Sequence, residues 1–368
     1  MAIVFAILLF SFLIFIHEFG HFIAAKLSSV QVNEFAIFMG PAIFKWGKGE
    51  TQYSIRCIPI GGFCAMEGED EDTDNPRSFQ KAPWWKRLII LVAGSAMNFV
   101  TGFLIFLLVF SPAQMLNTPV IAQADPNCHI VSQDALQVGD RILEIGGEKV
   151  YVASNVSLLL NLEAADAYKG VAVEELASVT PATTDFLVER NGRKILLEDV
   201  SLKPLQVGVT ENGAVSLLFG ITLSREEADF GDILSYTWNN CVDTVRTVRL
   251  SLQMLFTGQA SVQDLTGVVG LVGMMSETAA ASETAWDAVL NMLYIGGFIA
   301  INLAVMNMLP IPALDGGRVL GLVLTTAIEK ITGKKLSSKV EGYIHGVGMI
   351  LLLALMAFVM FKDIFALF

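Results

Sequence analysis

The chain has 368 residues, of which 54% are hydrophobic and 16% charged, and its mean hydropathy is +0.58. This apolar content exceeds what a soluble domain needs to fill its core, so it excludes an ordinary soluble protein and favours several membrane spans. The formal net charge is −12, and no basic stripe with interleaved aromatic residues occurs. Nucleic-acid binding is therefore excluded as well.

Four long apolar stretches predict four transmembrane helices, because about 20 apolar residues cross the ~30 Å of hydrocarbon. The fold class expected is a polytopic α-helical membrane protein with a small membrane-associated β-hairpin or sheet and a β-rich α+β insert. The predicted parts are 1–26, the first span; 27–87, a cytoplasmic-side β-hairpin and loop; 88–110, the second span; 111–204, the β-rich insert; 205–285, an amphipathic helical segment; 286–315, the third span; 316–341, a loop; and 342–368, the fourth span.

The sides of the membrane are predicted from the positions of lysine and arginine. These residues cluster in the loops 27–87 and 316–341, which the positive-inside rule places in the cytoplasm. The large acidic insert between the second and third spans is then expected outside.

The first span contains the sequence His17-Glu18-Phe19-Gly20-His21. Residues at i and i+4 of a helix share one face, so both imidazoles can bind one Zn²⁺, with the Glu18 carboxylate beside them. Ionisable side chains are costly at membrane depth and usually have a function there. The alternative is a signal peptide with incidental polar residues, but the stretch lacks a basic n-region and is too long for a typical h-region.

A third metal ligand is predicted near the end of the third span. Pro310 and Pro312 break the helix there, and Asp315 follows the break. The first and third spans run in the same direction, so Asp315 and the two histidines are expected near the same, cytoplasmic, end. Two histidines and one carboxylate leave the fourth zinc position open for water, as in catalytic sites. By itself, Asp315-Gly-Gly is more typical of a turn, and the interpretation as a ligand is favoured only in combination with the two histidines of the first span.

Short β-runs are predicted at 32–46 and 51–58, with a turn at 47–50, and Pro59 with Gly61 and Gly62 is expected to end the second run. This hairpin either caps the helices or binds an extended substrate at its free edge. In the second span, Asn98 is either an interhelical contact or a substrate contact. Cys128 and Cys241 are able to pair only if the outside is oxidising.

These motifs together make the chain similar to the site-2 protease family of intramembrane metalloproteases, particularly the regulator of sigma-E protease type. The matching segments are HEFGH at 17–21, IPIGGF at 58–63, AGSAMN at 93–98, LTGVVGL at 265–271 and NMLPIPALDG at 307–316. The resemblance implies a zinc metalloendopeptidase that binds Zn²⁺ through His17, His21 and Asp315. It also implies Glu18 as the catalytic base and a PDZ-like extracytoplasmic insert.

The resemblance further implies regulated intramembrane proteolysis of single-span proteins, such as anti-sigma factors or remnant signal peptides, after a first cut outside the membrane. The expected location is the bacterial inner (cytoplasmic) membrane, with the zinc site near the cytoplasmic side. Asn307 is expected to handle substrate, and Asn98, Pro310 and Pro312 complete the predicted substrate-binding set. No carboxylate-binding loop is recognised before Gly139. Whether the insert binds peptide or only filters by size is left open.

Two alternatives come from other classes of protein. A non-proteolytic, zinc-binding PDZ membrane scaffold would share the metal ligands, but a structural site has no use for a base such as Glu18. A transporter would carry ionisable residues as a relay along its spans, whereas here they concentrate at one site.

Overall fold

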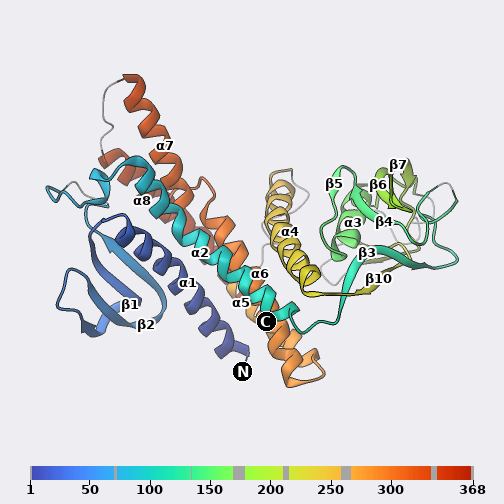
Figure 1. The fold of residues 1–368 in the computed structure, drawn as a ribbon, viewed down its shortest axis with the longest axis horizontal. Helices are drawn as coiled ribbons and strands as arrows, with labels where there is room; N and C mark the ends of the chain where they lie inside the picture. Colours follow the sequence, from blue (N-terminus) through green and yellow to red (C-terminus); the bar gives the residue numbers. More distant parts are fainter. Residues whose placement is uncertain are drawn as a thin grey trace. The chain divides into compact units, whose positions relative to one another are not determined.

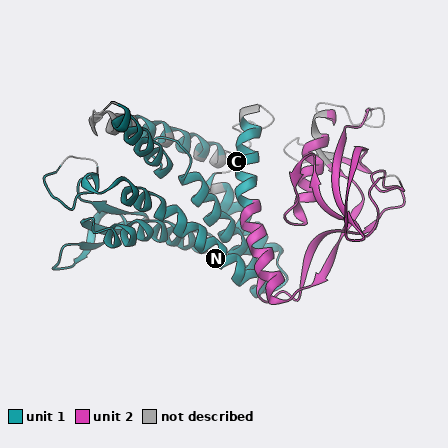
Figure 2. Ribbon diagram, turned by 45° about the horizontal axis from the view of Figure 1, so that its top comes forward, with its two compact units in different colours: residues 1–109, 244–368 teal, residues 110–243 magenta. Residues whose placement is uncertain are grey.

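The computed structural model describes residues 2–69, 73–133, 135–168, 179–209, 215–257, 267–332 and 338–365. Parts of the acidic stretch 67–74, of the loop 316–341 and of the segment 265–271 lie outside these residues. The chain divides into two compact units, Met1–Val109 with Thr244–Phe368, and Phe110–Asp243 (Figure 2).

Long helices make up most of the first unit (Figure 1). They are α1 (Ala2–Leu27), α2 (Trp84–Phe110), α5 (Val268–Ala281), α6 (Ala285–Asn307), α7 (Asp315–Thr332) and α8 (Ser338–Phe365). Among the described residues, three helices are long and apolar enough to cross a membrane: Ile3–Leu27, Trp84–Phe110 and Ala285–Asn307. The predicted membrane protein with several spans is thereby confirmed. The apolar part of α8, Gly346–Val359, is shorter, so a fourth span stays a prediction.

Two apolar clusters hold α1 in place. Near its start, Leu9 and Leu13 are buried together with residues of α5 and α6, such as Met275 and Ala300. Near its end, a second cluster joins α1 to the hairpin, α2 and α7; its members are Ala24, Ala25, Val30, Val32, Phe35, Cys64, Met66, Phe79, Ile90, Leu91 and Leu322. Phe79 belongs to a short 3₁₀ helix, η1 (Phe79–Lys81), that precedes α2.

Glycines let α1 and α2 pack closely. A Cβ added to Gly20 of α1 would lie 2.5 Å from the carbonyl oxygen of Ala93 and 2.8 Å from Cγ of Met97, both in α2. Only a residue without a side chain allows the two backbones to approach so far, as is common between membrane helices.

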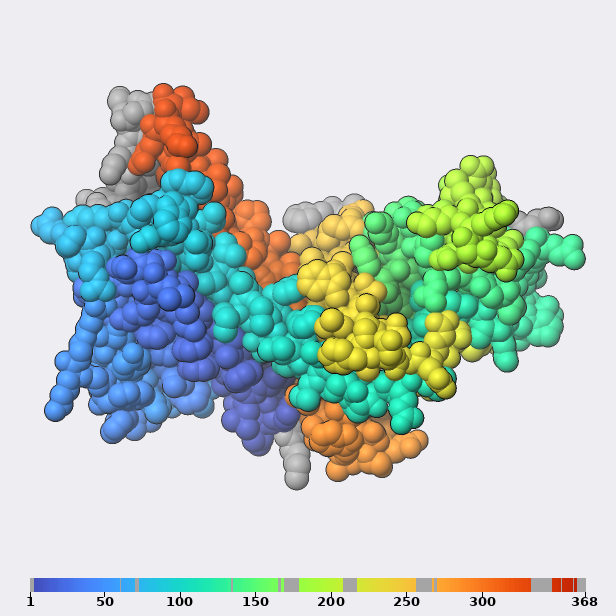
Figure 3. Space-filling view, viewed as in Figure 1, coloured from blue at the N-terminus to red at the C-terminus, as the bar shows by residue number. Residues whose placement is uncertain are grey.

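A β-hairpin of β1 (Val32–Trp46) and β2 (Gln52–Met66) lies beside α1 (Figure 3). Both strands bend, so residues 32–37 pair with 62–66 on one side and with 52–55 on the other. The bends contain Gly40 and Gly61, whose φ angles of +84° and +83° favour glycine. Phe38 has a φ of +71°, which is unusual for an aromatic residue.

The prediction that β2 ends near Pro59 is wrong. The strand continues to Met66 because the bend at Gly61 turns it back to pair with the start of β1. Proline is tolerated where a strand bends and bulges. The Ser11 hydroxyl of α1 donates a hydrogen bond of 3.1 Å to the Pro59 carbonyl oxygen, so the hairpin runs back along the first span.

An ion-pair cluster ties the hairpin turn to neighbouring segments. Glu50 accepts hydrogen bonds from Arg77 Nη1 at 2.6 Å and from Lys26 Nζ at 2.9 Å. The Arg77 hydrogen bond lowers the pKa of Glu50 from 4.5 to about 2. Because the pKa of Glu50 is lower in the folded chain than in the unfolded one, its ion pairs stabilise the fold fully above pH 4.5. We expect this contribution to be lost as the pH falls toward 2.

The second unit is built on an antiparallel sheet in the order β10-β3-β4-β6-β7, with β5 paired to β4 and a separate β8-β9 hairpin. The strands are β3 (Met115–Ala124), β4 (Arg141–Ile145), β5 (Glu148–Lys149), β6 (Thr183–Arg190), β7 (Arg193–Ser201), β8 (Gln206–Val209), β9 (Val215–Leu218) and β10 (Ile221–Glu227). The prediction that residues 205–285 are helical is wrong for the first part of that segment, which forms the strands β8 to β10. Apolar Ile221 and Leu223, which alternate with polar Thr222 and Ser224, suit β10, which pairs with β3.

Helix α3 (Ser154–Tyr168) packs against β4, β6 and β9. Helix α4 (Phe230–Thr257) follows β10 and lies within the segment 205–285 that is predicted to be helical. All four cysteines are free, so Cys128 and Cys241 do not pair; Cys128 Sγ instead donates to the Phe219 carbonyl oxygen at 2.9 Å.

An ion pair with a buried carboxylate joins the residue before β4 to the end of β6. The Asp140 carboxylate accepts from Arg190 Nε and Nη2, both at 2.7 Å, and the Asp140 side chain is 1% exposed. Asp140→Ala leaves the guanidinium without this partner, and we expect a loss of about 3 kcal/mol of local stability. Faster hydrogen exchange of the β4 and β6 amides would measure it. As a control, Glu226→Ala removes the exposed pair with Arg141 and should cost less than about 1 kcal/mol.

Candidate metal centre

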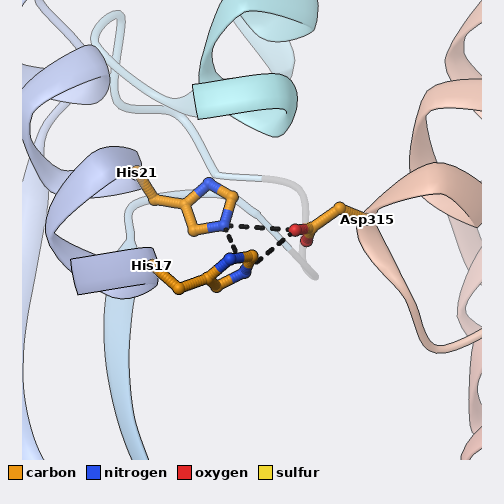
Figure 4. Close-up of side chains that lie close together, drawn as sticks. All are labelled: His17, His21 and Asp315. Atoms are coloured by element: carbon orange, nitrogen blue, oxygen red, sulfur yellow. Dashed lines mark hydrogen bonds and ion pairs between the residues drawn. The ribbon is translucent and has the colours of Figure 1, made fainter. Parts of the chain in front are cut away.

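His17 and His21 lie one helical turn apart on α1, and both side chains are buried. Their rings are nearly perpendicular, with centroids 4.8 Å apart and Nε2 atoms 3.2 Å apart (Figure 4). The local sequence is helical and apolar on both sides, so the helix continues through the pair and fixes their spacing.

Asp315 is the first residue of α7 rather than the end of the third span, which corrects the predicted boundary. Helix α6 ends at Asn307, because Pro310 and Pro312 have no N–H to continue its hydrogen bonding. An aspartate suits the start of the next helix, where the N–H groups are unsatisfied and the helix dipole favours negative charge.

The loop before Asp315 is compact and strained. Ala313 has a φ of +81°, a region that costs a residue with a side chain about 1–2 kcal/mol. A Cβ on Gly317 would lie 2.9 Å from the backbone carbon of Ile311 and 3.2 Å from Cα of Pro312. Gly317, two residues after Asp315, therefore allows the first turn of α7 to pack directly against this loop.

The Asp315 carboxylate meets both imidazoles. Its Oδ2 lies 3.0 Å from His17 Nε2 and 3.3 Å from His21 Nε2. Among the described residues, this buried oxygen accepts no hydrogen bond of standard geometry. Atoms that bind one tetrahedral zinc at ~2.0–2.1 Å lie about 3.3 Å apart. The separations of 3.0–3.3 Å among the three atoms therefore fit a single zinc ion.

The opposite side of the imidazoles is closed by α2. His21 Nδ1 lies 2.8 Å from the Ile90 carbonyl oxygen, an arrangement that leaves Nε2 free to bind a metal. A Cβ on Gly94 would lie 2.7 Å from Cε1 of His17 and would also overlap the His21 ring. On this side, the imidazoles therefore pack directly against the α2 backbone at Gly94.

We expect Gly94→Ala to displace the imidazoles and to weaken zinc binding by about 10–100-fold, the range for changes next to metal ligands. Competition with a chelator on the purified chain would measure the affinity. Gly273→Ala in α5, where an added Cβ meets nothing within 4 Å, is the matched control. Equal zinc affinity in both variants would contradict the expectation.

A cavity of about 320 Å³ opens beside the three residues; its lining is Ile14, His17, Glu18, Asn98, Leu303, Asn307, Ala313, Leu314 and Asp315. The amide nitrogens of Asn98 and Asn307 lie 3.5 Å and 3.4 Å from His17 Nδ1. Asn98 is 1% exposed, and its Oδ1 has no hydrogen-bond partner among the described residues.

The family model named Peptidase family M50 matches residues 5–355. The chain belongs to peptidase family M50. This membership confirms the predicted resemblance to the site-2 proteases and the predicted enzyme class.

Among its relatives, a protein of Clostridium acetobutylicum named as a candidate zinc metalloprotease is 33% identical over 98% of this M50 peptidase and 97% of the relative. A protein of Fusobacterium nucleatum with the same description is 31% identical over 100% of both chains. The regulator of sigma-W protease RasP of Bacillus subtilis is 26% identical over 98% of each. The names of the first two agree with the predicted Zn²⁺ cofactor.

The M50 peptidase brings most of its predicted site residues together. His17, Glu18, Asn98, Asn307 and Asp315 line one cavity. Pro310 and Pro312 do not line it; they shape the loop before Asp315. Sequence reasoning missed the part played by Gly94, for which the signals were its place among the small residues 93–96 and in the family-like segment 93–98.

Proposed function

We propose that this protein is an intramembrane zinc endopeptidase that cleaves single-span membrane proteins, such as anti-sigma factors and remnant signal peptides. The observation that carries the proposal is the convergence of His17, His21 and Asp315 from two distant helices, beside a cavity that also contains Glu18. Membership of the M50 family supports it.

In this proposal, His17 and His21 bind zinc through Nε2 and Asp315 binds it through Oδ2. Zinc, when bound, supplies a Lewis acid that polarises the scissile carbonyl and lowers the pKa of water toward ~7. Glu18 acts as general base, accepts the proton of the attacking water and returns it to the leaving amine. Asn307 hydrogen-bonds the substrate backbone from the cavity wall.

Asn98 has a second proposed role besides substrate contact. If the Asn98 amide is turned by 180°, its unpartnered Oδ1 faces His17 Nδ1, where it accepts the ring N–H. Such a bond orients a metal-binding histidine and raises its basicity.

The hairpin supports binding of an extended substrate. Residues 62–66 form an outer edge of the sheet, because they pair only with 32–37. Gly62 lies next to Glu18, since a Cβ on Gly62 would be 3.6 Å from Glu18 Cγ. We propose that substrate adds a strand here, which exposes peptide bonds that a helix shields.

The fourth span, the sides of the membrane and the domain limits other than those corrected at 205–285 and 286–315 are also part of this proposal. We place the hairpin and the zinc site near the cytoplasmic side of a bacterial inner membrane and the second unit outside, as the lysine and arginine pattern favours.

We further propose that the second unit is PDZ-like and filters substrates by binding their ends. Three features support this: β10 is an edge strand, an apolar cavity of about 130 Å³ lies between α3 and residues 217–223, and the amide N–H groups of Phe219 and Gly220 donate no hydrogen bond within the described chain. Free amides beside an edge strand suit a peptide carboxylate. The carboxylate loop would then follow β9, instead of preceding Gly139.

The decisive experiment for the enzyme uses the full-length chain in lipid vesicles with a panel of single-span substrates. We expect cleavage within the apolar segment, inhibition by a chelator and recovery on addition of Zn²⁺. Cleavage that a chelator does not affect, or no cleavage of any substrate, would refute the proposal.

The filter is tested by replacing residues 115–227 with a short linker, which is feasible because Met115 pairs with Glu227. We expect the shortened chain to cleave substrates with long ectodomains that the full chain rejects. Unchanged selectivity would exclude a filter.

A further inference from the structure

Two parts of the first unit carry the three proposed ligands. One part is α1 with the hairpin that packs against it, and it carries both imidazoles. The other is α7, whose first residue is Asp315 and which follows the loop 308–314. Zinc affinity depends on how firmly these two parts are held at the separation that the ligand atoms need.

An ion pair links the two parts close to the metal site. Arg318 Nη1 of α7 contacts Glu69 Oε1, which follows the end of β2 by three residues. The two side chains are 30% and 18% exposed, so water screens the pair only partly. Arg318 lies three residues after Asp315, on the same side of the first turn of α7.

Glu69 belongs to the part that holds the imidazoles. Met66, which ends β2, is buried in one cluster with Ala24 and Ala25 of α1. The turn after β2 is fixed by Glu67, whose amide donates to Gln31 O at 2.9 Å and whose carbonyl accepts from Phe79 N at 2.7 Å. Loss of the Glu69 contact is therefore expected to change the position of α7 relative to α1.

We propose that the Arg318–Glu69 ion pair positions Asp315 against the two imidazoles and thereby sets zinc affinity. Arg318 is thus a positioning residue and takes no part in the reaction itself. The inference rests on the proposed zinc function. Leu322 of α7 is buried in the same apolar cluster as α1, so we expect α7 to stay packed when the ion pair is removed. The expected effect is then a weaker affinity for zinc and not a loss of the fold.

The test uses the full-length chain and measures the zinc dissociation constant by chelator competition, without an activity assay. We expect Arg318→Gln and Glu69→Gln each to weaken zinc binding by about 10–100-fold, as for other residues that orient metal ligands. The double exchange of Glu69→Arg with Arg318→Glu restores the opposite charges and should recover most of the affinity.

Arg77→Gln is the matched control, because it removes another arginine–glutamate pair, between Arg77 and Glu50 of the hairpin turn, in which no residue of α7 takes part. Wild-type affinity in both Arg318→Gln and Glu69→Gln would overturn the inference, as would an equal loss in Arg77→Gln. These outcomes differ from failure of the proposed function, in which the wild-type chain itself binds no zinc.

Discussion

Glu18→Gln is expected to leave one zinc bound per chain and to lower the cleavage rate by at least about 100-fold. Glutamine keeps nearly the size and polarity of glutamate, so the packing of Glu18 beside Gly62 should persist. It has no basic oxygen to accept a proton, and it therefore removes the base without removing a metal ligand.

The measurement combines metal analysis with a cleavage assay in lipid vesicles. Glu34→Gln, which alters another hairpin-side carboxylate that bonds Ser54 and Arg56, controls for loss of a negative charge in this region. Retained turnover in Glu18→Gln would remove Glu18 from the role of base. Loss of zinc would instead give it a role in metal binding.

Asp315→Ala is expected to abolish zinc binding at concentrations that saturate the wild-type chain. It deletes an oxygen that lies within 3.3 Å of both imidazole nitrogens. The loss of zinc affinity should exceed the roughly 10–100-fold loss that is typical when a residue that hydrogen-bonds a metal ligand is changed. Proteolysis should be lost in parallel.

Zinc content after purification and affinity by chelator competition are the measurements. Asp74→Ala, which changes an exposed carboxylate outside the site, is the control and should bind zinc like the wild-type chain. An Asp315→Ala chain that keeps full zinc affinity would mean that the ion is bound elsewhere, and the proposed site would be wrong.

The convergence of His17, His21 and Asp315 could be predicted because most of its signals are local. His17 and His21 depend only on helical spacing, and the direction of the spans was enough to bring Asp315 to the same end. The place of Asp315 at the start of α7 was not predicted, because it depends on how Gly316 and Gly317 pack against the preceding loop.

The hairpin and the second unit show where sequence patterns fail. Pro59 and Gly61 usually end a strand, yet tertiary pairing with β1 carries β2 on to Met66. Strand β10 was missed because its partner, β3, lies about a hundred residues earlier, beyond the reach of periodicity. The part of Gly94 depends on which helix faces it, and a single span does not reveal that.

The close packing of α1 and α2 at their glycines bears on which helices are able to move when a substrate enters the site. Gly20 brings the α1 backbone against the α2 backbone, and Gly94 leaves room for the two imidazoles between the helices, so we expect this helix pair to keep its spacing. A polypeptide that reaches the zinc site needs room, and we do not expect α1 and α2 to separate to provide it. We therefore expect the movement that admits a substrate to come from α6 and α7 and to involve the loop around Ala313, whose φ is +81°.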